Sequence, residues 1–174
     1  MTPALSLVIL IVLLAAFGTA LVGSLRAAPW LPTRTKDVER LLSMAELREG
    51  EMLFDLGSGD GRLIAAAARK PGISAIGYEI SLVPWIWSQL RLRGSRLSNA
   101  RVRYQDFFRA DFSQADVIVC FLTPWAMKKL KPKILREMKP GSRLVSYTFS
   151  LPEIKATRID RPHSDDIPIF LYRR

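Results

Sequence analysis

One short stretch constrains the fold of this chain more than any other. An apolar run ends at Asp55, three glycines follow at alternate positions (57, 59 and 61), and an alanine-rich segment runs from Leu63 to Ala68. This order is typical of a strand, a tight turn and a helix. Glycine has no Cβ, so the backbone of such a turn can approach a ligand closely. Open α/β sheets bind nucleotides at the carboxyl ends of their strands, so the stretch predicts a ligand cradle.

An acidic residue further along strengthens this interpretation. Ser74 to Tyr78 is typical of a second strand, and Glu79 stands at its end. The distance from the glycine turn is about the ~20 residues expected for an acid that accepts hydrogen bonds from ribose hydroxyls. Glu79 is therefore predicted to share a site with the turn.

Three segments together resemble the first three motifs of class I S-adenosylmethionine-dependent methyltransferases. They are residues 54–62, Gly77-Tyr78-Glu79 and Gln105-Asp106-Phe107-Phe108. The turn has the spacing Gly-x-Gly-x-Gly, whereas dinucleotide dehydrogenases have Gly-x-Gly-x-x-Gly, which favours S-adenosyl-L-methionine over NAD. The resemblance implies a Rossmann-like α/β sheet that is mostly parallel. Ala156 to Asp160 and Ile167 to Tyr172 are predicted to form a C-terminal antiparallel hairpin.

A narrower resemblance covers most of the chain from Trp30 to Phe149. Leu31-Pro32-Thr33, residues 55–62, residues 130–134 and residues 139–146 look like the membrane-anchored protein-lysine methyltransferases. That family includes eukaryotic enzymes acting on the ATP synthase c-subunit and the adenine nucleotide translocase, and small archaeal relatives. The resemblance implies N-methylation of a protein substrate with an exposed lysine.

The class I resemblance also implies roles for individual residues. Gly57 and Gly59 permit close backbone approach, Asp55 orients the methionine end of the cofactor, and Asp106 accepts from the adenine amino group. Thr33 is either a hydrogen-bond donor to the methionine carboxylate or part of a plain turn. The whole predicted cofactor set is Thr33, Asp55, Leu56, Gly57, Ser58, Gly59, Glu79, Ile80, Asp106, Phe107 and Phe121.

The methyl acceptor is expected near Thr123-Pro124-Trp125. The preceding run, Asp116 to Leu122, is apolar and typical of a strand buried on both faces. Class I enzymes that act on amino groups often carry Asn/Asp-Pro-Pro-Tyr/Phe after this strand, and this chain does not. Thr123 and Trp125, with Phe121, are predicted to form an apolar channel that lowers the pKa of a lysine acceptor. A lipid amine or RNA acceptor, and a cofactor-binding module without activity, stay open as alternatives.

The N-terminal segment is a candidate membrane anchor. Leu5 to Val22 carries no charge, and adding Ala4 and Gly23 reaches the ~20 residues that cross a bilayer. A cleaved signal peptide, with small residues at Ala27-Ala28, is the alternative, but no basic residue precedes the apolar run. We predict an anchor over 4–23, a linker and helix over 24–50, and a methyltransferase domain over 51–174.

The position of the basic residues predicts the orientation of this anchor. Arg26, Arg34, Lys36 and Arg40 follow the span, which predicts a single-pass membrane protein with its catalytic domain in the cytoplasm. The net charge of +10 favours an anionic neighbour, either lipid or nucleic acid. Nucleic acid is the less favoured partner because no additional RNA-binding module is visible.

Several further expectations concern single elements. Thr35 is predicted to cap a helix that buries Val38, Leu41, Leu42 and Ala45. Residues 81–93 are predicted to be a helix that buries Leu82, Trp85, Ile86 and Leu90, with a substrate groove lined by Trp85 and Trp87 as the alternative. Residues 150–155 are too few for a crossover helix, so an open apolar surface is expected there. Cys120 is the sole cysteine, which excludes a disulfide and a cysteine-rich metal site, and we expect no metal.

Overall fold

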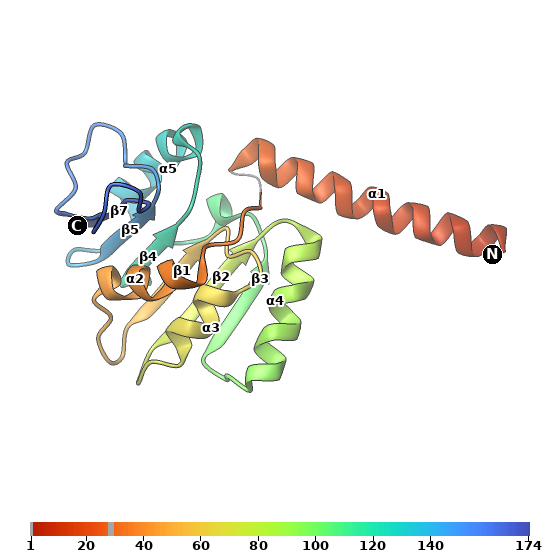
Figure 1. The fold of residues 1–174 in the computed structure, drawn as a ribbon, viewed down its shortest axis with the longest axis horizontal. Coiled ribbons are helices and arrows are strands. Elements are labelled where there is room, and N and C mark those ends of the chain that lie inside the picture. The colour runs from red at the N-terminus through yellow and green to blue at the C-terminus, as the bar shows by residue number, and fades with distance from the viewer. Residues whose placement is uncertain (1, 28–29) are drawn as a thin grey trace.

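The computed structural model describes residues 2–27 and 30–174, and its centre is a seven-stranded sheet (Figure 1). The strand order is β3-β2-β1-β4-β5-β7-β6. The first five strands pair in parallel and the last two are antiparallel to their neighbours. Their bounds are β1 Met52–Leu56, β2 Ser74–Glu79, β3 Ala100–Tyr104, β4 Val117–Cys120, β5 Arg143–Tyr147, β6 Arg158–Asp160 and β7 Ile169–Arg173. The predicted fold class, with its C-terminal hairpin, is confirmed.

Helices cover both faces of this sheet. The helices α2 (Thr35–Ala45), α3 (Arg62–Ala68) and α4 (Leu82–Ser95) contribute to one core, and α5 (Pro124–Glu137) with the short 3₁₀ helix η1 (Phe107–Arg109) contributes to the other. The strand β4 supplies Val117 and Val119 to the first core and Ile118 and Cys120 to the second. A strand buried on both faces is what its continuous apolar run predicted.

The helix α1 (Pro3–Arg26) projects away from the sheet (Figure 1). The side chain of Thr2 accepts from the backbone N–H of Leu5, and Pro3 occupies the first turn, so the helix begins with a regular N-cap. Pro3–Leu25 is long and apolar enough to cross a membrane. Ala28, part of the alternative cleavage site, lies outside the described residues.

The helix α4 corrects the predicted burial pattern. It packs on the domain through Pro84, Ser88 and Leu92, while Ile86 and Leu90 are exposed. Ser88 lies against the glycine turn, where a Cβ at Gly61 would be 3.0 Å from the Cβ of Ser88. Such a close approach needs a small residue at this point on the inner face of the helix. Trp85 is half-buried against the first core, so the prediction fails only for Ile86 and Leu90.

Two smaller expectations have different outcomes. Arg34 occupies the N-cap of α2 and Thr35 is its first helical residue, although Val38, Leu41, Leu42 and Ala45 are buried as expected. The chain between β5 and β6 contains no helix, as expected. Leu151 and Ile154 from this segment line a mostly apolar hollow next to α5, so part of the expected apolar surface is open.

Candidate functional site

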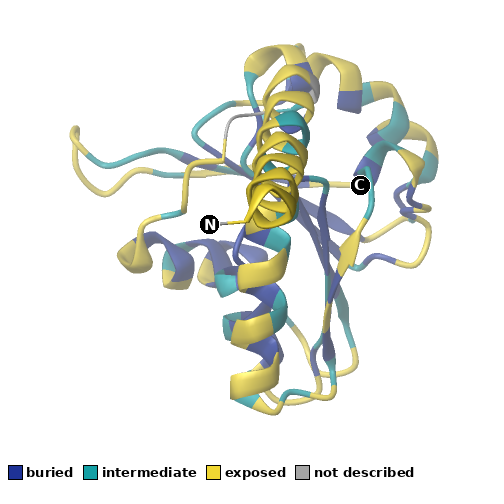
Figure 2. Cartoon of the chain, turned by 90° about the vertical axis from the view of Figure 1, so that its right-hand side faces the viewer, coloured by how far each residue is buried: buried dark blue, intermediate teal, exposed yellow. Residues whose placement is uncertain are grey.

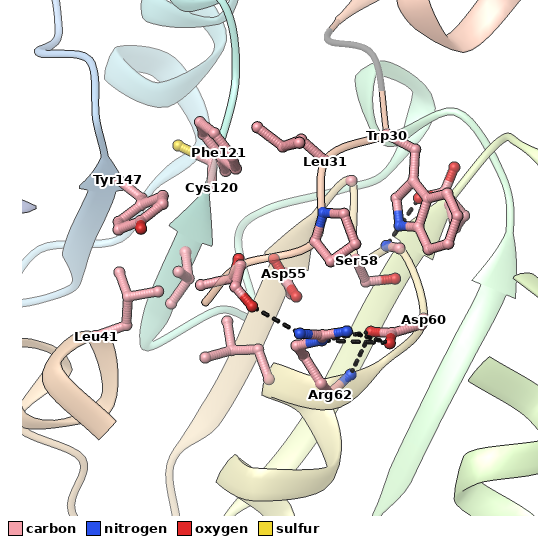
Figure 3. Close-up of a pocket in the computed structure, with 17 residues that line it drawn as sticks. Trp30, Leu31, Leu41, Asp55, Ser58, Asp60, Arg62, Cys120, Phe121 and Tyr147 are labelled. Atoms are coloured by element: carbon pink, nitrogen blue, oxygen red, sulfur yellow. Dashed lines mark hydrogen bonds and ion pairs between the residues drawn. The ribbon is translucent and has the colours of Figure 1, made fainter. Parts of the chain in front are cut away.

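A pocket lies at the carboxyl ends of β1, β2 and β4 (Figure 3). In the sheet, β2 and β3 lie on one side of β1, and β4 and β5 lie on the other. Open α/β sheets bind ligands at such a point, where the strand order reverses. The pocket is open to solvent, and the space within it, this solvent included, measures about 640 Å³. Its lining residues are Trp30, Leu31, Pro32, Thr33, Leu41, Asp55, Gly57, Ser58, Gly59, Asp60, Arg62, Leu63, Glu79, Val119, Cys120, Phe121 and Tyr147.

The carboxylate of Glu79 ties the glycine turn to the end of β2. Its Oε2 accepts from the backbone N–H of Gly59 at 2.8 Å. Its Oε1 accepts from the N–H groups of Ile80 at 2.9 Å and Ser81 at 2.7 Å. Because the side chain is buried and held by three donors, its position in the pocket is fixed before any ligand arrives.

The glycine turn leaves room for a ligand against the backbone. Gly57 and Gly59 have φ of +81° and +54°, a region that side-chain-bearing residues rarely adopt. A Cβ at Gly59 would lie 2.7 Å from Nε1 of Trp30, which covers this part of the turn. The buried hydroxyl of Ser58 has no hydrogen-bond partner among the described residues. An orphaned polar atom beside an open backbone suits a polar ligand such as S-adenosyl-L-methionine.

Asp55 lies in the same pocket and is deeply buried. Burial raises the pKa of this carboxyl to about 8, and the charges of Glu79 and Asp60 add to the effect. Without a cation beside it, Asp55 is therefore mostly protonated at neutral pH. A positively charged group entering the pocket would favour its ionised form.

A cluster around Asp60 holds the segment before α2 over the pocket (Figure 3). Arg62 forms an ion pair with Asp60 at 2.8 Å and donates through Nη1 to the carbonyl of Thr33 at 2.7 Å. Arg91 of α4 pairs with the same carboxylate. Burial raises the pKa of Asp60, but the two guanidiniums outweigh it and hold the pKa below its usual value.

The other end of the pocket is apolar. Phe121 and Tyr147 meet edge to face with ring centroids 4.9 Å apart, and Leu41 and Val119 complete the wall. The hydroxyl of Tyr147 donates to Oδ2 of the buried Asp37 at 2.6 Å, so Tyr147 contributes its ring to the pocket wall. Burial of Tyr147 and its bond to Asp37 both raise the pKa of this phenol, which stays neutral.

A second hollow of about 350 Å³ adjoins the first and shares Gly57 and Glu79 with it. Ile80, Asp106 and Phe107, three residues of the predicted cofactor set, line it. Asp106 caps η1 by accepting from the N–H of Phe108 at 2.9 Å. The two hollows therefore lie side by side at the end of β2.

The structure separates some predicted residues from this site. Thr123 caps α5 and its hydroxyl donates to the carbonyl of Ala27 at 2.7 Å, so it holds the chain after α1. The Trp125 side chain is exposed, and the ammonium group of Lys129 lies over its ring in a cation–π contact. Leu56 is fully buried in the core. None of these three residues lines the pocket at the glycine turn.

Arg62, Leu41 and Tyr147 belong to the site although the sequence interpretation missed them. Arg62 directly follows the last glycine of the turn, so its place in the motif is a signal that could have identified it. Tyr147 ends β5, and strand order and packing bring it and Leu41 to the pocket. Cys120 also lines the pocket, but burial raises the pKa of its thiol to about 12, so it is a neutral, packed side chain.

Comparisons with known proteins agree with this architecture. Residues 55–158 match the model of the ANTKMT methyltransferase domain family. The chain is 36% identical over 127 residues to the ATP synthase c-subunit lysine N-methyltransferase of Homo sapiens, matching 71% of this chain and 53% of the human protein. It is 35% identical to a protein-lysine N-methyltransferase of Saccharolobus islandicus, over 71% of this chain and 78% of the archaeal one. The chain thus spans about half the length of the human relative.

Solved structures show the same fold. An RNA methyltransferase from Salinibacter ruber, crystallised with S-adenosyl-L-homocysteine, superposes with a TM-score of 0.77 at 29% identity, covering 82% of this chain and 93% of that one. A ribosomal protein L11 methylase from Lactobacillus delbrueckii subsp. bulgaricus superposes with a TM-score of 0.68 at 14% identity, covering 82% and 81%. The predicted methyltransferase resemblance is confirmed, and with it S-adenosyl-L-methionine as the methyl donor. The chain belongs to the ANTKMT methyltransferase domain family.

Proposed function

We propose that this protein transfers methyl groups to lysine side chains of a protein substrate. The observation that carries the proposal is the apolar inner end of the pocket, where Phe121 and Tyr147 adjoin the glycine turn. The human and archaeal relatives, both named as lysine N-methyltransferases, support the choice of acceptor.

A few residues position the cofactor in the proposed site. S-adenosyl-L-methionine supplies an activated methyl group on a positively charged sulfonium, so the protein mainly has to position the reactants. Glu79 is preset to accept hydrogen bonds from the ribose hydroxyls at the junction of the two hollows. Asp55 is placed to face the cationic methionine end, and Arg62 holds the Thr33 segment above it.

The apolar end of the pocket prepares the acceptor. A free lysine has a pKa near ~10.4 and must lose its proton before its nitrogen can attack. The walls formed by Leu41, Val119 and Phe121 offer no hydrogen-bond acceptor to a charged ammonium, so they lower the pKa of the inserted lysine. The neutral amine would then be able to attack the methyl group, which leaves the sulfonium as its sulfur becomes a thioether.

We further propose that α1 is retained as a single membrane span with the domain in the cytoplasm. The helix is packed against the domain, because the backbone N–H of Leu82 donates to Oγ1 of Thr19 at 3.1 Å. Gly23 is buried, and a Cβ there would lie 2.6 Å from Oγ of Ser81. The basic residues Arg34, Lys36 and Arg40 after the span support the orientation.

The test is methylation of membrane and soluble extracts from a strain that lacks this protein. The purified full chain is supplied with S-adenosyl-L-methionine labelled in the methyl group, and protein, lipid and RNA are then separated. We expect label in protein, lost with Glu79→Ala and retained with Glu39→Ala, whose carboxylate is 74% exposed.

Label in another fraction decides against the lysine acceptor. The Salinibacter neighbour is titled an RNA methyltransferase, which is the reason to count the RNA fraction separately. Label in RNA or in lipid amines moves the acceptor to that class. Tight binding of S-adenosyl-L-homocysteine with no label in any fraction points to a module that binds the cofactor without turnover.

A further inference from the structure

The helix α4 carries an apolar stripe on its outer face. Val83, Ile86, Trp87 and Leu90 are exposed by 40%, 43%, 57% and 54%, and their spacing of i, i+3, i+4 and i+7 places them on one side. A solvated helix normally turns its polar residues outward. An exposed apolar stripe of this kind marks a surface that is covered by something else.

An exposed side of α4 is turned in the direction in which α1 leaves the domain. In Figure 2 α1 points toward the viewer, and the exposed side of α4 lies below it, turned the same way. Figure 1 shows α4 lying crosswise to α1 at the edge of the domain. A bilayer crossed by α1 would therefore lie along α4.

The length of α1 sets the distance between that bilayer and α4. Twenty residues from Pro3, about the number needed to cross the hydrocarbon core, end at Val22. Contact with the domain begins before that point, because Ala16 and Thr19 are half-buried and Thr19 bonds to Leu82. At 1.5 Å per residue, Thr19 lies about 5 Å inside the end of the span, so the first turn of α4 reaches the membrane interface.

A group of four arginines borders the stripe. Arg93 and Arg96 of α4 and Arg101 and Arg103 of the neighbouring β3 line one hollow. No carboxylate in the described part of the chain forms an ion pair with any of the four, whereas Arg91 is paired with Asp60. On α5, by comparison, Lys131, Lys133 and Arg136 have acidic partners, as does Lys139 after its end, and among the described residues only Lys128 and Lys129 of this helix form no ion pair. Unpaired cations beside an apolar stripe suit anionic lipid headgroups.

We propose that the outer face of α4 lies in the headgroup region of the membrane, with Trp87 as an interfacial anchor and the four arginines on anionic lipids. Tryptophan prefers this region because one end of its ring system is apolar and the other donates a hydrogen bond. The proposal rests on the membrane span proposed above. In this arrangement the cofactor pocket is held beside the membrane, within reach of lysines that project from its surface.

The experiment places a fluorescent dye on single cysteines of the full chain in vesicles of neutral and anionic phospholipids with brominated acyl chains. Cys120 is buried and stays unlabelled in the folded protein. The probe position is Trp87→Cys. Gln114→Cys, exposed before the amino end of β4, is the matched control, and Leu10→Cys reports on the span itself.

We expect the bromolipids to quench the dye at position 87 severalfold more than at 114. Arg93→Glu with Arg96→Glu should reduce this quenching, and Lys128→Glu on α5 should not. Equal, weak quenching at 87 and 114 with strong quenching at position 10 overturns the proposal but leaves the span intact. A dye at 87 that is shielded from water yet unquenched also overturns it, since a protein would then cover α4. Weak quenching at position 10 rejects the span and this proposal together.

Discussion

The backbone N–H of Gly59 donates a 2.8 Å hydrogen bond to Oε2 of Glu79, 20 residues further along the chain. Together with the bonds from the N–H groups of Gly57 and Ser58 to the carbonyl of Tyr78, it holds the glycine turn against the end of β2 at the pocket. The bond also explains the spacing of about 20 residues between the glycine turn and the acid, because Glu79 supports the turn as well as facing the proposed ligand.

Glu79→Gln is expected to weaken cofactor binding strongly. The amide keeps the shape of the side chain but turns an N–H₂ group toward backbone donors, which leaves at least one donor unsatisfied. Losing such a charge-assisted bond costs about 1–3 kcal/mol, which would correspond to roughly 5- to 150-fold in affinity. Titration calorimetry with S-adenosyl-L-homocysteine measures the change. Glu39→Gln is the control, and equal affinities for the two variants would contradict the role given to Glu79.

Gly59→Ala is expected to disturb Trp30 and destabilise the turn. The new Cβ would lie 2.7 Å from Nε1 of Trp30, and φ is +54°, so the strain costs on the order of 1 kcal/mol. Gly94→Ala is the matched control, since a Cβ there meets nothing within 4 Å and alanine favours the helix. Thermal unfolding compares the two variants. A stable Gly59→Ala variant with unchanged cofactor affinity would show that close backbone approach is not needed.

Cofactor affinity is expected to rise with pH between about pH 6 and about pH 7.5, by up to ~10-fold per pH unit. Burial raises the pKa of Asp55 to about 8, and binding a cationic ligand favours the ionised form, so the proton must leave on binding. Asp55→Asn should remove this dependence as well as weaken binding. A pH slope that persists in Asp55→Asn would assign the proton to another group.

The same pKa shift predicts how stability of the ligand-free protein depends on pH. The folded pKa of Asp55 lies above its unfolded value, so the folded state binds more protons between about pH 4 and about pH 8 and its stability falls as pH rises through that window. Asp55→Asn should flatten the curve in urea unfolding measurements. An unchanged curve would show that the carboxyl is not buried as the structure has it.

Tyr147→Phe is expected to cost about 1–3 kcal/mol of stability at neutral pH while leaving the pocket wall intact. Burial raises the pKa of Asp37, but the bonds from Tyr147 and Arg40 outweigh it and hold the pKa below its usual value. A stabilising contribution from a lowered carboxyl pKa is present above the unfolded pKa and is lost as pH falls through the folded pKa. The variant should therefore match the wild type in strong acid. A lost kcat with unchanged stability would instead place the hydroxyl in the chemistry.

The parts that the sequence predicted well are those with a local signal. The strand, glycine turn and acid of the cofactor site depend on backbone conformation and spacing, and β4 on a continuous apolar run. The helix α4 has no such signal, because Ile86 and Leu90 are apolar yet lie outside while Ser88 lies inside. The side that faces the domain is set by tertiary contacts, such as the close approach of Gly61 to Ser88 and the bond from Trp85 Nε1 to the carbonyl of Val102.

The residues that line the proposed acceptor end of the pocket could not all be predicted from the sequence. Thr123 and Trp125 follow β4 as expected for an acceptor motif, but the Thr123 hydroxyl caps α5 and contacts Ala27 instead. The wall opposite Phe121 comes from Tyr147 and Leu41, two residues far apart in the chain that meet only through sheet order and packing. Long-range contacts of this kind leave no local pattern.

The most direct test of the central claim is to map the methyl group on the product. Membranes from the strain that lacks the protein are incubated with the full chain and unlabelled or methyl-labelled cofactor, and peptides are analysed by mass spectrometry. The account predicts methyl marks on lysine side chains that appear with the wild type and disappear with Asp55→Ala. Methylation found only on another side chain, or only on lipid or RNA, would contradict it.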